Sequence, residues 1–163
     1  MNMMDKFRFI QASAPANMSG AAMTAKYVSL KNYNHLTIVI TTGAWAAGTA
    51  AVTLTKASDV SATDAETARL QYMWSDEVTS NTFVKNTVTA NTFNLDTANK
   101  QYIIEVDAAD LKHDATTPFG AEKTVNFDCV TLAVASPGVN IDLYGVEYIL
   151  SEPRYPDVSP LTD

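Results

Sequence analysis

The sequence has few of the residues from which active sites and metal centres are usually built. Its 163 residues include one cysteine, Cys129, and two histidines, His35 and His113. A single cysteine excludes a disulfide within the chain, and none of these residues stands in the close pairs typical of metal sites. The chain also has no Gly-x-Ser-x-Gly motif and no glycine loop that would hold a phosphate. We therefore predict that the protein is not an enzyme and that it has no cofactor and no metal site.

Basic residues are scarce as well, with 11 Lys and Arg against 18 Asp and Glu and a net charge of −7. A nucleic-acid surface needs clustered Lys and Arg to neutralise phosphates, so we expect no nucleic-acid partner. The acidic surface either keeps the protein soluble or complements a basic patch on a protein partner.

Long apolar runs are missing too. No stretch approaches the roughly 18 apolar residues that a membrane helix requires, so we expect no membrane partner. The first ten residues carry Asp5, Lys6 and Arg8 where a signal peptide would be apolar. With one cysteine, this start favours folding in a reducing cytosol, where Cys129 would be a small core residue on a strand.

Two groups of polar residues remain candidates for chemistry. His113 lies beside Asp110 and Asp114, but no nucleophile motif accompanies it, and a solvated loop histidine is the favoured interpretation. The acidic residues of the segment 59–66 supply oxygen ligands for calcium, although their spacing departs from that of a known calcium loop. We expect a solvated turn there.

The sequence is instead rich in strand patterns. Val28 and Leu30 alternate with polar residues, and so do Val52 and Leu54, which is the period of a half-buried strand. Threonine is frequent and helix formers are seldom clustered, which favours strands over helices. We predict eight strands, over 27–31, 36–42, 51–57, 69–75, 82–89, 101–106, 128–135 and 141–150.

This spacing of strands and turns predicts an all-β fold, a β-sandwich or a jelly-roll-like double sheet. We expect the β domain to span 26–151. Residues 1–25 are predicted to be an extended N-terminal arm, in which 6–11 alternates well enough for a short strand and 11–25 is small and aperiodic. Residues 152–163 contain three prolines and are predicted to be an extended C-terminal tail.

Five apolar and aromatic residues are candidates for binding a partner. Phe7, Phe9 and Ile10 lie on the predicted arm, so we expect removal of 1–20 to leave the β domain folded and to weaken attachment. Trp45 lies in a loop of small residues, where it either caps the end of the sandwich or anchors an interface. Tyr155 lies between prolines on the tail and is a further docking candidate.

Three segments resemble a family of small structural proteins from tailed-phage virions. They are Tyr27-Val-Ser-Leu-Lys-Asn-Tyr33, Ala51-Val-Thr-Leu-Thr-Lys-Ala57, and Tyr148-Ile-Leu-Ser151 followed by Arg154 and Tyr155. The resemblance implies a virion protein that binds the outer capsid surface as a cement or decoration protein. It also implies the major capsid protein as partner and assembly as a homotrimer. A neck, tail or baseplate component is an alternative, and a carbohydrate-binding module using Trp45 and Trp74 is an alternative of another class.

Overall fold

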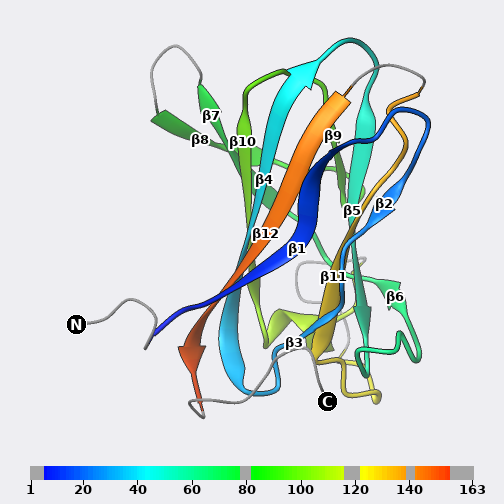
Figure 1. Ribbon diagram of the computed structural model, residues 1–163. Helices are drawn as coiled ribbons and strands as arrows, with labels where there is room; N and C mark the ends of the chain where they lie inside the picture. Colours follow the sequence, from blue (N-terminus) through cyan, green and yellow to red (C-terminus); the bar gives the residue numbers. More distant parts are fainter. Residues whose placement is uncertain (1–5, 78–81, 116–121, 139–141, 155–163) are drawn as a thin grey trace.

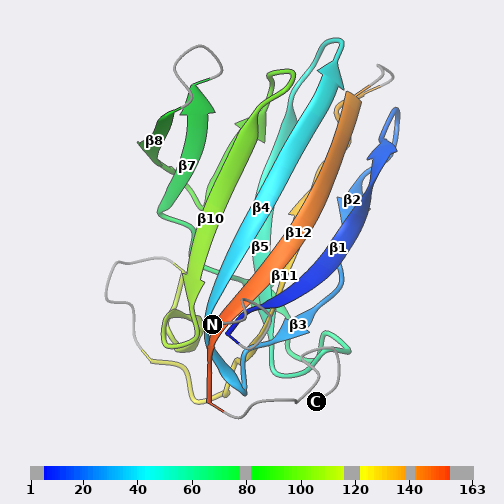
Figure 2. The same ribbon diagram turned by 60° about the vertical axis from the view of Figure 1, so that its left-hand side comes forward.

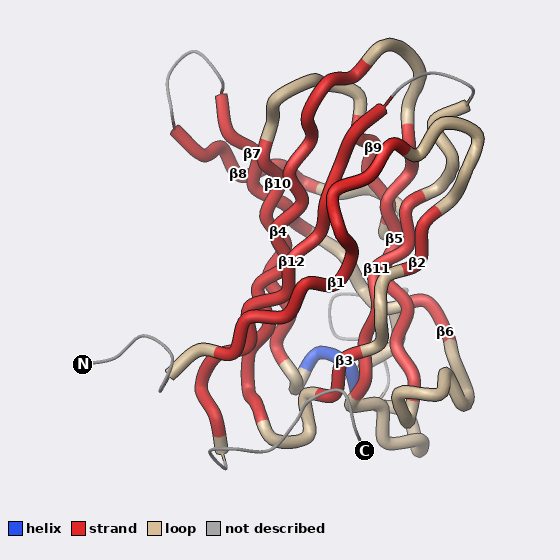
Figure 3. The backbone as a smooth tube through the Cα atoms, viewed as in Figure 1, coloured by secondary structure: helices blue, strands red, loops and turns tan. Residues whose placement is uncertain are grey.

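The computed structural model describes residues 6–77, 82–115, 122–138 and 142–154. Two antiparallel sheets pack face to face, and the described helical structure is one short 3-10 turn, η2 (Asp110–Lys112). The predicted all-β sandwich is therefore confirmed, and Figures 1 and 3 show its two layers.

The larger sheet, sheet A, has six strands in the order β1-β12-β4-β10-β7-β8. Figure 2 shows them side by side, with the β7–β8 hairpin at one edge and β1 at the other. Their bounds are β1 Arg8–Asn17, β4 Tyr33–Trp45, β7 Tyr72–Glu77, β8 Thr82–Thr87, β10 Gln101–Asp107 and β12 Asp142–Pro153.

The smaller sheet, sheet B, is centred on two long strands, β5 (Ala50–Ala57) and β11 (Cys129–Val134). Four short strands extend it: β2 (Met23–Thr24) and β3 (Val28–Ser29) pair with opposite ends of β11. In the same way β6 (Glu66–Thr67) and β9 (Thr92–Leu95) pair with opposite ends of β5. Each flank of sheet B thus consists of two short strands.

The core lies between the sheets and follows the period-two alternation of the strands. In β12 the buried positions are the even-numbered ones, from Asp142 to Leu150, and the intervening residues face the opposite side. Leu36, Ile38 and Ile40 of β4 are fully buried in the same layer. Because β4, β10 and β12 follow this rule over their central residues, the apolar pattern of the sequence specifies which side of sheet A is inside.

Most predicted strands are confirmed, with shifted ends. The strands predicted at 36–42 and 141–150 are longer in the structure, whereas the one at 27–31 is reduced to β3. Strand β9, which pairs with β5, lies outside the eight predicted strands. Cys129 is buried on β11, as expected of a core residue.

The N-terminal segment corrects the prediction of an arm over 1–25. From Arg8 onward it forms β1, which pairs with β12 over its whole length, and Ile10 and Ala12 are buried in the core. Small residues over 12–16 let this strand bend over its neighbour at two bulges, which local periodicity does not reveal. Removal of 1–20 would uncover β12, so from the structure we expect this deletion to destabilise the domain.

The C-terminal tail predicted from residue 152 begins as part of a strand, because β12 continues to Pro153, which pairs with Tyr33. Arg154 then donates from Nε to the Asn34 Oδ1 at 2.6 Å. The remainder of the predicted tail, including Tyr155, lies outside the described residues.

Candidate functional site

The outward side of sheet A, called the open face below, is the candidate interaction surface. Sheet B packs on its other side, and no described strand crosses in front of it in Figure 2. Several apolar side chains lie here in register, half-buried among their neighbours: Val39 stands beside Ile103, and Phe9 beside Ile149. An uncovered sheet face with aligned apolar residues is a typical protein-binding surface.

A groove of about 520 Å³ crosses the open face over β1, β12 and β4. Gly43 of β4 and Gly145 of β12 are among its lining residues. A Cβ on Gly145 would lie 3.0 Å from the Pro15 Cγ, so the bulged part of β1 rests directly on this glycine. Leu143, 36% exposed, is an apolar lining residue on β12.

The lining of the groove is suited to holding apolar side chains. Its lining is mainly apolar or hydroxyl-bearing, and Glu147 is its only carboxylate. Tyr144 also lines it, and burial raises the pKa of its phenol to about 12, so the hydroxyl stays neutral. The groove therefore offers no acid–base pair at neutral pH.

At the other end of the open face, His35 bridges two carboxylates of β10. Its Nδ1 lies 2.6 Å from the Asp107 Oδ1, its Nε2 contacts Glu105, and the Thr37 hydroxyl donates to that same carboxylate at 2.8 Å. Burial lowers the pKa of His35, but hydrogen bonds and charge from the two carboxylates outweigh it, and the pKa is raised. Each ring nitrogen already has a partner, so the cluster is an ion-pair clamp between β4 and β10.

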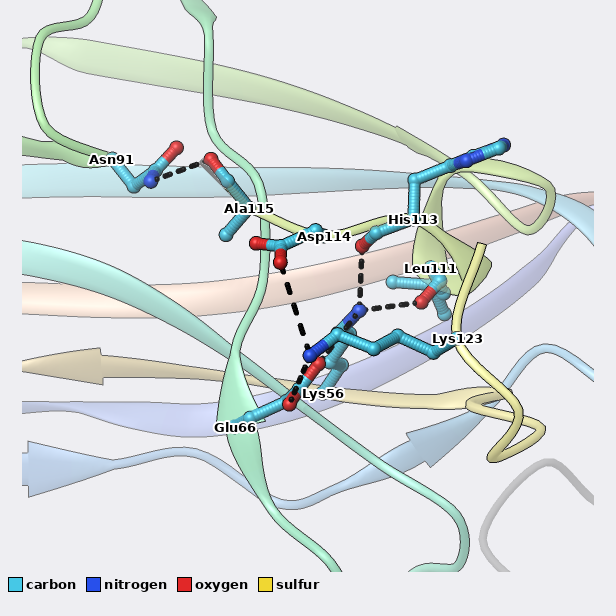
Figure 4. Close-up of polar contacts among 8 residues, drawn as sticks. All are labelled: Lys56, Glu66, Asn91, Leu111, His113, Asp114, Ala115 and Lys123. Atoms are coloured by element: carbon cyan, nitrogen blue, oxygen red, sulfur yellow. Dashed lines mark hydrogen bonds and ion pairs between the residues drawn. The ribbon is translucent and has the colours of Figure 1, made fainter. Parts of the chain in front are cut away.

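A second ionic cluster lies in the interior and is drawn in Figure 4. Lys56 of β5 is fully buried, and its Nζ donates to the carbonyls of Leu111 and His113 at 2.8 and 2.6 Å. It also pairs with Glu66 at 3.1 Å. The lysine thereby ties β5 and β6 to the loop after η2, which is a structural role.

The sequence contains a signal for the buried Lys56, which was not among the predicted site residues. The alternation through Val52 and Leu54 places position 56 on the inward face, where a charged residue needs partners. No comparable signal marks His35, because its carboxylate partners are 70 and 72 positions away.

The structure separates the three N-terminal candidates. Phe9 is half-buried on the open face, whereas Ile10 points into the core and is 8% exposed. Phe7 precedes β1 and is half-buried. Of these residues, Phe9 therefore remains the best placed to contact a partner.

The tryptophans have partners of their own. Trp45 packs against the core beside Tyr144, with ring centres 6.5 Å apart, and donates from Nε1 to the Gly48 carbonyl at 3.1 Å. It caps the end of the sandwich. Trp74 is half-buried on the open face, where the Lys85 Nζ lies 5.3 Å from its ring centre and 3.8 Å from that of Tyr72.

The acidic residues Asp59 and Glu66 have partners within the protein. Asp59 accepts hydrogen bonds from the backbone of Ser61 and Thr63 and closes the turn, while Glu66 points to Lys56. Among the described residues no group of three potential ligands could hold a metal ion. No helix in the described ranges has the length and apolar character needed to span a membrane.

Comparisons with known proteins give limited similarity. No family model matches the chain, and no curated protein matches it. Among solved structures it is similar to the SPBc2 prophage-derived protein YomS, with 12% identity and a TM-score of 0.46 over 90% of this chain and 93% of that one. It is also similar to the protein of infectious bursal virus derived T=1 particles, with 11% identity and a TM-score of 0.26 over 91% of this chain and 40% of the viral one. The role of the chain therefore has to be inferred from its own residues.

Proposed function

We propose that the protein is a non-enzymatic structural component of a phage virion that binds the outer surface of the capsid as a cement or decoration protein. The observation that carries the proposal is the open face of sheet A, a sheet surface that no described strand covers and that holds a groove with a mainly apolar or hydroxyl-bearing lining. The strand motifs that resemble tailed-phage virion proteins support the same setting.

The partner in this proposal is the major capsid protein, with the protein attached as a homotrimer. An apolar groove with a polar rim is the usual anatomy of a protein interface, in which a few buried anchors provide most of the affinity. The net charge of −7 suits a partner surface with basic residues around the contact.

The carbohydrate-binding alternative finds less support in the aromatic residues. A sugar ring stacks on an exposed aromatic face, but Lys85 already lies over the rings of Tyr72 and Trp74. Trp45 is held at the end of the sandwich by Tyr144 and Gly48. These contacts leave no row of free aromatic faces among the described residues.

The test is reconstitution of capsids from which the protein is absent, with occupancy measured by cryo-electron microscopy. Leu143→Asp places a charge in the groove, and we expect occupancy at limiting concentration to fall about tenfold or more because the charge would be buried without a partner. Ser61→Asp is the matched control, since it adds the same charge on an exposed turn. Circular dichroism checks that both variants are folded.

The result separates the candidates. Density on the capsid surface that is lost in the Leu143 variant and kept in the control supports the proposal. Density confined to the neck, tail or baseplate refutes the capsid role and supports the other structural role. Equal capsid occupancy by both variants would remove the groove from the binding mechanism.

A further inference from the structure

The β7–β8 hairpin carries most of the large apolar side chains that the described surface exposes. Tyr72, Phe83 and Val84 are 43%, 46% and 44% exposed, and Leu143 is the only other large apolar residue in this class among the described ones. Five of the six residues of β8 are exposed, on both of its faces. Figures 1 and 2 show the hairpin at the margin of sheet A.

The two edges of sheet A differ in how well they are protected. β1 contains Pro15, which has no N–H, and two register shifts, both of which hinder pairing with a further strand. β8 contains no proline, and its register with β7 runs without interruption from Tyr72↔Thr87 to Glu77↔Thr82. It is therefore the edge on which another strand can be added.

The direction of the backbone groups follows from the ladder. Val88 N–H donates to the Gln71 carbonyl at 2.7 Å, in the continuation of the β7–β8 register. Because hydrogen-bonded and non-hydrogen-bonded pairs alternate in an antiparallel ladder, the even-numbered residues of β8 point their backbone groups at β7. Those of Phe83 and Lys85 point away from the sheet.

We propose that β8 pairs antiparallel with β8 of a second copy about a two-fold axis at Val84. Phe83 of each copy then lies opposite Lys85 of the other, and their outward backbone groups form about four hydrogen bonds. This register places the Lys85 ammonium of one copy beside the Phe83 ring of the other. A shift of the register by two residues would instead place the Lys85 side chains of the two copies opposite each other, where they repel.

Charge favours a second copy as the occupant. β8 carries one lysine and no acidic residue in a chain with a net charge of −7, so two copies meet here with little repulsion. Two short strands bury less than the roughly 1,200–2,000 Å² of a stable interface, so association depends on concentration. The contact does not depend on the proposed function. It would join two single copies of the chain or, in the proposed homotrimer, one copy from each of two trimers.

Cysteine cross-linking tests the register. Val84→Cys faces itself across the axis in a close pair with Cα atoms about 4.5 Å apart, within reach of a disulfide. The native Cys129 is fully buried and does not compete. We expect a disulfide-linked dimer under mild oxidation, and none from the matched control Asn86→Cys, which lies opposite Thr82. No dimer from the Val84 variant, or equal dimer from both, overturns the proposal.

A second pair of variants tests the backbone pairing. Phe83→Pro in the Val84→Cys background removes the outward N–H but no hydrogen bond to β7, so an edge strand tolerates it. We expect the cross-linking rate to fall about tenfold or more, because two hydrogen bonds of the dimer are lost. Phe83→Ala keeps the N–H and should have a smaller effect. Equal rates for the proline variant and its parent, with folding confirmed by circular dichroism, would refute the strand pairing.

Discussion

The buried Lys56 provides the sharpest test of how this fold is held together. Its ammonium group has three oxygen partners: the carbonyls of Leu111 and His113, and the carboxylate of Glu66. The Nζ also lies 4.4 Å from the centre of the Phe127 ring. Lys56→Met keeps the volume of the side chain and removes all of the polar contacts.

The cost of this substitution follows from what is left behind. Glu66 is still 3.4 Å from Lys123 and is partly exposed, so it keeps a partner. The two carbonyls belong to the backbone, and each costs about 1–3 kcal/mol when it is left buried without a donor. Removing one member of a buried ionic cluster typically costs about 3–5 kcal/mol. We expect a loss of about 4 kcal/mol, or roughly 8–16 °C in Tm for a chain of this length.

Thermal and urea unfolding followed by circular dichroism measure the loss. Lys112→Met is the matched control, because that lysine is exposed and lies next to the same loop; its effect should stay within about 0.5 kcal/mol. Glu66→Gln keeps both carbonyl contacts and should cost about 1–2 kcal/mol. A loss below about 1 kcal/mol for Lys56→Met would refute the reasoning, since the carbonyls would then have found other donors.

Three further outcomes follow from the structure. The pKa of His35 is raised, so its charged form stabilises the fold fully below about pH 6.5, the ordinary pKa of histidine. This contribution to stability is lost as the pH rises through the raised pKa. His35→Gln should therefore flatten the pH dependence of stability measured by urea unfolding. Ile10→Ala should lower the free energy of unfolding by about 2–3 kcal/mol in the same assay, because Ile10 is buried in the core. An unchanged free energy of unfolding would instead support an arm that is separate from the core. Gly145→Val should destabilise by about 1–3 kcal/mol by pushing Pro15 off β12, and an unchanged Tm would show that β1 can move freely.

The β-sandwich could be predicted from the sequence because its signals are local. Alternation along 51–57 and 101–106 specifies both the strand and its buried face, and the ends of these two strands differ from the predicted ones by one residue. Cys129 was placed in the core by the same reasoning. For the site, the sequence supplied Phe9 as a partner-binding candidate and Trp45 as either a cap or an interface anchor, each from residue type and neighbours.

Only the tertiary structure decided which segments meet. The first strand lies beside the last, so the supposed arm is an edge of the sheet, and pairing across such a distance leaves no trace in local periodicity. The groove is lined by residues of β1, β4 and β12, which lie far apart in the sequence. The partners of His35 and Lys56 likewise come from distant strands and loops. Alternation states which side of a strand is buried, and long-range packing decides which charges and which empty spaces lie next to one another.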